Sequence, residues 1–170
     1  MTDSLTTYKL ILLYMLDKVD FPLTTSQISE FILEKEYTTY FKLQETLAEM
    51  EHSGLLRVET THNRTLYHLT DNGLDTIQYF KNKISPAIQR DIDEFLKEKK
   101  YDLKEEVSVK SDYYLNTNHE YEVCCQIVEN GFSLIDLKLT VPTESEAEAM
   151  AGNWASQSQD IYSLLLTKLL

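Results

Sequence analysis

The chain has 170 residues, enough for one large domain or two small ones. Hydrophobic residues make up 42% of it, which excludes a disordered protein, and the longest apolar run, Leu10 to Leu16, is too short to span a membrane. Basic residues number 16 against 28 acidic ones, and the resulting charge of −12 disfavours non-specific binding to nucleic acid or anionic lipid.

Three helices are predicted before residue 54. Apolar residues recur with helical spacing over 5–18, and Pro22 lies in the break that follows. The second helix begins at Thr24-x-x-Gln27, a capping box. The third begins after Thr39 and ends at Gly54, which suits the left-handed position that closes a helix.

After residue 54 the apolar period changes from helical to alternating. Two short strands are predicted over 56–59 and 66–69, joined by a polar tip over 60–64. Another helix begins at Thr70-Asp71-Asn72-Gly73. Three helices, a two-stranded wing and a further helix form the order of a winged helix-turn-helix domain. We therefore predict such a domain over residues 1–84.

A second domain is predicted over residues 85–170. Ser85-Pro86 begins a helix with a charged end at 97–100. Three alternating strands follow over 107–115, 120–127 and 135–141, and Asn130-Gly131 predicts a tight hairpin turn. Thr143-x-x-Glu146 caps a long C-terminal helix. The expected fold is α+β, an N-terminal winged helix-turn-helix followed by a three-stranded antiparallel sheet packed by that helix.

The third helix is the predicted recognition helix, which lies in the major groove in helix-turn-helix proteins. Lys42 could contact phosphate, Gln44 could pair with an adenine edge, and Glu45 could accept from cytosine N4. Wings reach the minor groove or phosphates and supply a second set of contacts. The predicted DNA-contacting residues are Thr39, Tyr40, Lys42, Gln44, Glu45, Arg57, His62, Asn63 and Arg64.

The charge distribution keeps a second function open. Residues 1–84 hold 8 basic and 12 acidic residues, and residues 85–170 hold 8 and 16. The third helix itself carries one lysine against three glutamates. The alternative to a DNA-binding protein is thus a winged helix that binds another protein and no DNA. If DNA is bound, the basic contacts must be few and doubled by dimerisation.

The C-terminal helix predicts a homodimer, because its last turns are apolar on more than one side. Aromatic residues Tyr113, Tyr121 and Trp154 face the predicted sheet–helix interface and leave a third hypothesis, a small-molecule sensor with an unknown effector. Neither a phosphate-binding glycine loop nor a histidine ligand spacing is present, so we expect no enzyme, metal or other cofactor.

The cysteines and the absence of a recognisable secretory signal predict a cytoplasmic protein. Cys124 and Cys125 are adjacent on a predicted strand, so their side chains point to opposite faces. Such a pair is neither a disulfide nor a zinc framework, and it suits a reducing compartment.

Several segments carry a family resemblance that spans almost the whole chain. They are Ser26-Gln27-Ile28, Tyr37 to Phe41, Leu69-Thr70-x-x-Gly73, Asp112-Tyr113, and Asn153-Trp154 near Ile161-Tyr162. With these motifs the chain is similar to a winged-helix family catalogued as a domain of unknown function (family 4364), which resembles bacterial transcriptional regulators. The resemblance implies a DNA-binding regulator with an appended α/β module. Where this chain has Glu45, such regulators usually have Arg or Lys.

Overall fold

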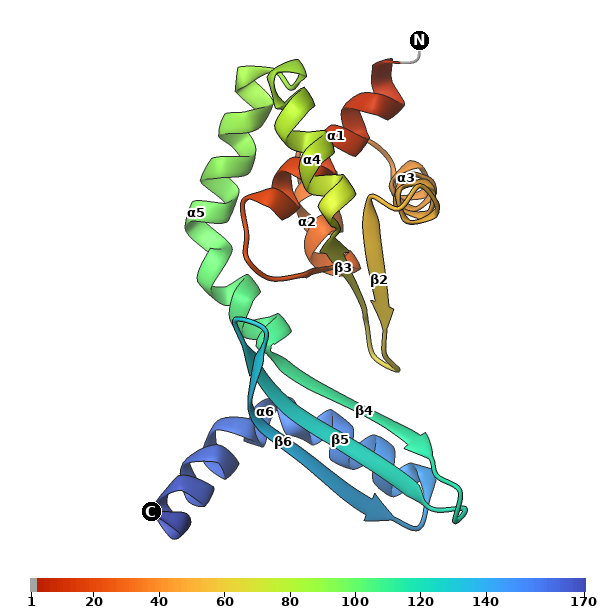
Figure 1. The fold of residues 1–170 in the computed structure, drawn as a ribbon, viewed down its shortest axis with the longest axis vertical. Coiled ribbons are helices and arrows are strands. Elements are labelled where there is room, and N and C mark those ends of the chain that lie inside the picture. Colours follow the sequence, from red (N-terminus) through yellow and green to blue (C-terminus); the bar gives the residue numbers. More distant parts are fainter. Residues whose placement is uncertain (1–2) are drawn as a thin grey trace. The chain divides into compact units, whose positions relative to one another are not determined.

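The computed structural model describes residues 3–170, with side chains from residue 6 onward, and the chain divides into two compact units (Figure 1). Unit 1 consists of residues up to Thr60 together with Arg64–Lys104. Unit 2 consists of Thr61–Asn63 and Glu105–Leu170. Each unit contains a three-stranded antiparallel sheet and helices, which confirms the α+β class.

Unit 1 begins with three helices, α1 (Asp3–Asp17), α2 (Thr25–Glu34) and α3 (Tyr40–His52). The predicted capping box at the start of α2 is confirmed. Thr24 Oγ1 accepts from the Gln27 N–H at 3.1 Å, and Gln27 Oε1 accepts from the Thr24 N–H at 2.9 Å. The N–H of the N-cap and one orphan donor of the first helical turn are satisfied in this way, which favours the start of α2 at this residue.

The sheet of unit 1 has one strand more than the two predicted. It contains β1 (Leu23–Thr24), β2 (Leu56–Thr60) and β3 (Thr65–Leu69) in the order β1-β3-β2. β1 has only two residues, too few for an alternating pattern, so periodicity gave no signal for it. The expected hairpin is formed by β2 and β3, with Arg57 opposite His68.

Thr70 and Gly73 join the hairpin to α4 (Asp71–Phe80). Thr70 Oγ1 accepts from the Gly73 N–H at 3.0 Å and lies 2.7 Å from the Gly54 carbonyl and 2.9 Å from that of Leu55, to which it donates. A Cβ added at Gly73 would lie 2.3 Å from the Leu55 oxygen. The Thr70-x-x-Gly73 motif thus allows a close approach of two backbone segments that no larger residue permits.

A 3-10 turn, η1 (Lys81–Lys83), leads into α5 (Pro86–Ser108). The predicted domain boundary fell after residue 84, whereas the compact units divide after Lys104. The reason is that Ile92, Phe95 and Leu96 of α5 are buried in the core that α1, α2 and α3 share. Gln27 adds a polar link, because its Nε2 donates to the Leu103 carbonyl at 3.2 Å.

The charged stretch at 97–100 does not end α5, contrary to the sequence-based expectation. The helix continues to Ser108, so Val107 is a buried helical residue and not the start of a strand. No glycine or proline occurs between Pro86 and Gly131, so the change from helix to strand carries no local marker.

Unit 2 contains β4 (Val109–Leu115), β5 (Tyr121–Glu129) and β6 (Phe132–Val141), in the order β4-β5-β6. The Asn130-Gly131 turn between β5 and β6 is confirmed, with φ of 51° and 81° at its two residues. These positive values are the ones that such a hairpin turn requires. A shift of register, a β-bulge or similar irregularity, falls between Ile127 and Val128.

The long helix α6 (Glu144–Leu169) packs on the sheet of unit 2, as predicted. Its buried residues are Ala147, Ala151, Trp154 and Ser158, and Trp154 Nε1 donates to the Gln126 carbonyl at 3.0 Å. Contacts of α6 fall mainly on β4 and β5. Leu139, on the edge strand β6, is therefore 45% exposed, although it alternates with polar residues as an inward-facing residue would. Leu115, at the very end of β4, is 54% exposed.

Candidate nucleic-acid interface

The first turns of α3 carry five of the predicted contact residues. Thr39 is the N-cap, and its side chain accepts from the Lys42 N–H at 3.3 Å. The side of α3 that faces the core consists of Leu43, Thr46, Leu47 and Met50. Because that side is fixed by burial, Tyr40, Gln44 and Glu45 lie on the remaining surface, where Tyr40 and Glu45 are exposed and Gln44 is half-buried.

An ion pair on this surface involves the lysine of α3. Lys42 Nζ lies 2.9 Å from Glu45 Oε2, one turn away on the same helix. The hydrogen bond that the Lys42 ammonium donates to Glu45 raises the pKa of Lys42, which stays charged at neutral pH. Its field is nevertheless compensated by the adjacent carboxylate. A phosphate approaching Lys42 must therefore compete with Glu45.

A second ion pair reduces the positive charge beside α3 further. Lys9 of α1 lies 2.9 Å from Glu49 of α3, so this lysine too is matched by a carboxylate of α3. In both ion pairs the carboxylate belongs to α3. Its remaining glutamate, Glu51, is exposed.

The β2–β3 hairpin carries the two arginines among the predicted wing contacts. Arg57 is exposed on β2, and Arg64 is half-buried just before β3. His68, opposite Arg57, contacts Glu59 with its Nε2 at 2.8 Å. Arg57 and Arg64 belong to unit 1 together with α3, and α3 contacts β2.

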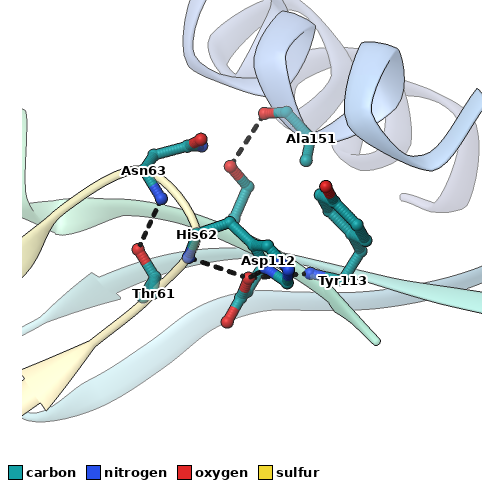
Figure 2. Close-up of polar contacts among 7 residues, drawn as sticks. Thr61, His62, Asn63, Asp112, Tyr113 and Ala151 are labelled. Atoms are coloured by element: carbon teal, nitrogen blue, oxygen red, sulfur yellow. Dashed lines mark hydrogen bonds and ion pairs between the residues drawn. The ribbon is translucent and has the colours of Figure 1, made fainter. Parts of the chain in front are cut away.

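His62 has a different environment. It belongs to unit 2, where its ring stacks on Tyr113 with centroids 3.9 Å apart and planes 9° from parallel. Asp112 Oδ1 accepts from the His62 backbone N–H at 3.3 Å and also contacts its ring Nδ1 (Figure 2). The Asn63 N–H donates to Thr61 Oγ1 at 3.4 Å. His62 is thus held by both residues of the Asp112-Tyr113 motif.

The predicted site residues therefore fall into two groups. Unit 1 contains the α3 residues and both arginines, and unit 2 contains His62 and Asn63. The sequence also carried a signal that the prediction left out. Phe41 is 85% exposed and contacts Tyr40 edge-on, with ring centroids 6.1 Å apart. Its position outside the apolar stripe of α3 would have identified it as a surface residue.

No cluster of three or more His, Cys, Asp or Glu that could hold a metal occurs between residues 6 and 170. Burial raises the pKa of the Cys125 thiol to about 11 and also raises that of Cys124, so both thiols are weak nucleophiles at neutral pH. Among the described residues, none of the helices combines the length and the apolar character that a membrane span requires.

The aromatic residues considered for a sensor site pack into the core of unit 2. Trp154 is 3% exposed and Tyr113 is 8% exposed, and Tyr121 lies against the same cluster. Tyr113 and Tyr121 meet edge-on, with ring centroids 6.3 Å apart. These side chains contribute to the packing between α6 and the sheet.

The comparison with known families gives one match. A family model described as a domain of unknown function (DUF4364) matches residues 8–169, which is nearly the whole chain. No curated protein and no solved structure matches significantly. The residues of α3 and the hairpin therefore carry the available information about function.

Proposed function

The chain belongs to the DUF4364 family, and we propose that it is a winged helix-turn-helix transcriptional regulator that binds double-stranded DNA as a dimer. The observation that carries this proposal is the order of elements in unit 1, three helices, the β2–β3 hairpin and α4. In that reading α3 is the recognition helix and the hairpin is the wing. Cys124 and Cys125 are both free, which suits a reducing compartment such as the cytoplasm.

The surface of α3 has the chemistry to read bases. Gln44 can pair with an adenine edge, Glu45 can accept from cytosine N4, and Phe41 can contact a thymine methyl group. Thr39 and Tyr40 lie at the start of the helix, where hydroxyl groups reach phosphates. These roles need the outward positions that the buried stripe of α3 leaves free.

The wing is assigned the phosphate contacts. Arg57 lies on its first strand and Arg64 just before its second strand, and both belong to the same unit as α3. His62 and Asn63 at its tip are assigned weaker roles, because the ring of His62 is stacked on Tyr113. A direct DNA contact by that ring requires its release from Tyr113.

A net charge of −12 disfavours DNA binding, and dimerisation offsets this by doubling the number of basic contacts. Lys42, Arg57 and Arg64 give three basic contacts in one chain and six in a dimer. Six neutralised phosphates predict a slope of about −5 for the logarithm of affinity against the logarithm of salt concentration. Such affinity falls steeply with salt and leaves little non-specific binding under physiological conditions.

The test is retention of genomic DNA fragments by the purified full chain across a salt series. We expect a few fragments to be retained specifically, with the steep slope given above. The double variant Arg57→Ala and Arg64→Ala loses two contacts per chain, which lowers the slope of a dimer by roughly 4. Arg90→Ala, an exposed arginine on α5, is the matched control and leaves the slope unchanged. No retention at low salt overturns the proposal.

A second candidate function, binding of a protein partner through α3, is favoured by one observation. Phe41 and Tyr40 are 85% and 51% exposed, and an adjacent aromatic pair is typical of the centre of a protein interface. This function requires no free basic charge on α3. Retention of a protein and of no DNA by the full chain, lost in Phe41→Ala, would favour it over the regulator.

A further inference from the structure

The last turns of α6, which we call the α6 tail (residues 159–170), carry apolar residues that the described chain leaves uncovered. The buried side of α6 runs through Trp154 and Ser158, and its helical spacing continues to Ile161, Leu165 and Leu169. Ile161 and Leu165 are half-buried, whereas Leu169 is 80% exposed. In Figure 1 this end of α6 extends past the strands of its own sheet. The packing of unit 2 thus stops before the apolar side does.

Further leucines widen the exposed surface of the tail. They are Leu164 at 54%, Leu166 at 43% and Leu170 at 102% exposure. A helix with this much apolar surface normally buries it against a partner. The question is therefore which partner has a matching surface.

The two charged residues of the α6 tail indicate which partner has a matching surface. Asp160 and Lys168 lie four residues before and four residues after Leu164, so all three share one side of the helix. In an antiparallel pair of identical helices around a twofold axis at Leu164, Asp160 of each chain meets Lys168 of the other. In a parallel pair, each charge would meet its own kind. The tail is therefore complementary to itself in the antiparallel arrangement alone.

We propose that the α6 tails of two chains pair antiparallel around Leu164, with two symmetric Asp160–Lys168 ion pairs at the ends of the contact. Leu164 packs against its own copy at the axis, and Ile161 adjoins it one turn earlier. An anionic lipid surface is a poorer partner, because the chain carries a charge of −12. This contact rests on the proposed function, because it supplies the interface of the proposed dimer. Dimerisation itself is measured without DNA.

The experiment is sedimentation velocity of the full chain and of charge-reversed variants at low salt. We expect a dimer for the natural sequence and a monomer for Leu164→Asp with an unchanged circular dichroism spectrum. Asp160→Lys alone and Lys168→Asp alone each replace two attractive pairs by two repulsive ones. Each is expected to weaken dimerisation about tenfold or more. Glu148→Lys, an exposed position on the packed part of α6, makes the same charge change as Asp160→Lys and serves as its control.

Restoration of the dimer is the decisive measurement. The double variant Asp160→Lys with Lys168→Asp restores opposite charges at both pairs, so its dissociation constant returns close to the natural value. Mixing the two single variants also places opposite charges at both pairs and yields heterodimers. A monomeric natural chain, a dimer that survives Leu164→Asp, or a double variant as weak as the single ones overturns the proposal. Specific DNA retention by a monomeric chain would overturn this contact while leaving DNA binding in place.

Discussion

The ring of Phe31 in α2 lies 4.9 Å from the ring of Phe95 in α5. Both belong to the core of unit 1, although the start of a new domain was predicted between them. Ser85 and Pro86 are good signals for the beginning of a helix, but they carry no information about the core that the helix joins. Most of α5 therefore packs in the same core as α1, α2 and α3.

Phe95→Ala is therefore expected to destabilise unit 1. Removing a buried phenylalanine lowers the free energy of unfolding by about 3–5 kcal/mol. Urea unfolding of the full chain, followed by tyrosine fluorescence and circular dichroism, measures the change. Tyr101→Ala on the same helix removes an aromatic ring that is 77% exposed and is expected to change stability by less than about 0.5 kcal/mol. Equal effects of the two variants would contradict the assignment of α5 to this core.

Gly73→Ala tests the close approach at the start of α4. The new Cβ would clash with the Leu55 carbonyl and would lie 2.7 Å from a methyl group of Leu69. We expect a loss of about 1–3 kcal/mol. Gly152→Ala in α6 is the counterpart, because nothing lies within 4 Å of its added Cβ. Alanine in that helix is expected to stabilise the chain by about 0.5–1 kcal/mol, so the two melting temperatures should shift in opposite directions.

Glu45→Gln removes the carboxylate that compensates Lys42. We expect DNA affinity at low salt to rise, because Lys42 then contributes its charge to a phosphate contact. Fluorescence anisotropy with a retained fragment measures the change. Glu51→Gln makes the same charge change at the other end of α3 and is expected to have a smaller effect. Weaker binding by Glu45→Gln would contradict this and would indicate that the hydrogen bond from cytosine N4 to the Glu45 carboxylate outweighs the gain at Lys42.

The two thiols are expected to react at different rates. At pH 8 a thiol with a pKa of about 11 is ionised in roughly one molecule in 1,000, so Cys125 should resist alkylation by iodoacetamide. Cys124 is less buried, because it faces away from α6, and should be modified first. Mass spectrometry after timed alkylation reports both sites, with denatured chain as the control in which they react alike. Equal rates in the folded chain would show that the core of unit 2 opens easily.

Features that depend on neighbouring residues were predicted well. The capping boxes at Thr24 and Thr143 and the turn at Asn130-Gly131 are present because each needs only a few adjacent residues. Gly54 has the positive φ of 73° expected where α3 ends. The exposure of Leu139 could not be predicted in this way. It depends on where α6 crosses the sheet, which is a property of the tertiary packing.

The same distinction applies to the candidate site. The helical spacing of Tyr40, Leu43, Leu47 and Met50 predicts one buried stripe on α3. The last three are buried and fix which residues face outward, whereas Tyr40, in the first turn, is 51% exposed. The stacking of His62 on Tyr113 joins residues about fifty positions apart, and no local pattern encodes it. The pairing of Lys42 with Glu45 is intermediate, since a spacing of three residues on a helix already places opposite charges together.

The register shift between Ile127 and Val128 has a consequence for fibril formation. β6 lies at an edge of its sheet and exposes Leu134 and Leu139, so an uninterrupted edge here would be a template for cross-β growth. The shift breaks the regular ladder at the start of this strand. Over the remaining residues, any added strand must pass the charges of Asp136 and Lys138, which discourages stacking of further chains. We therefore expect the chain to form fibrils slowly even though leucines are exposed along this edge.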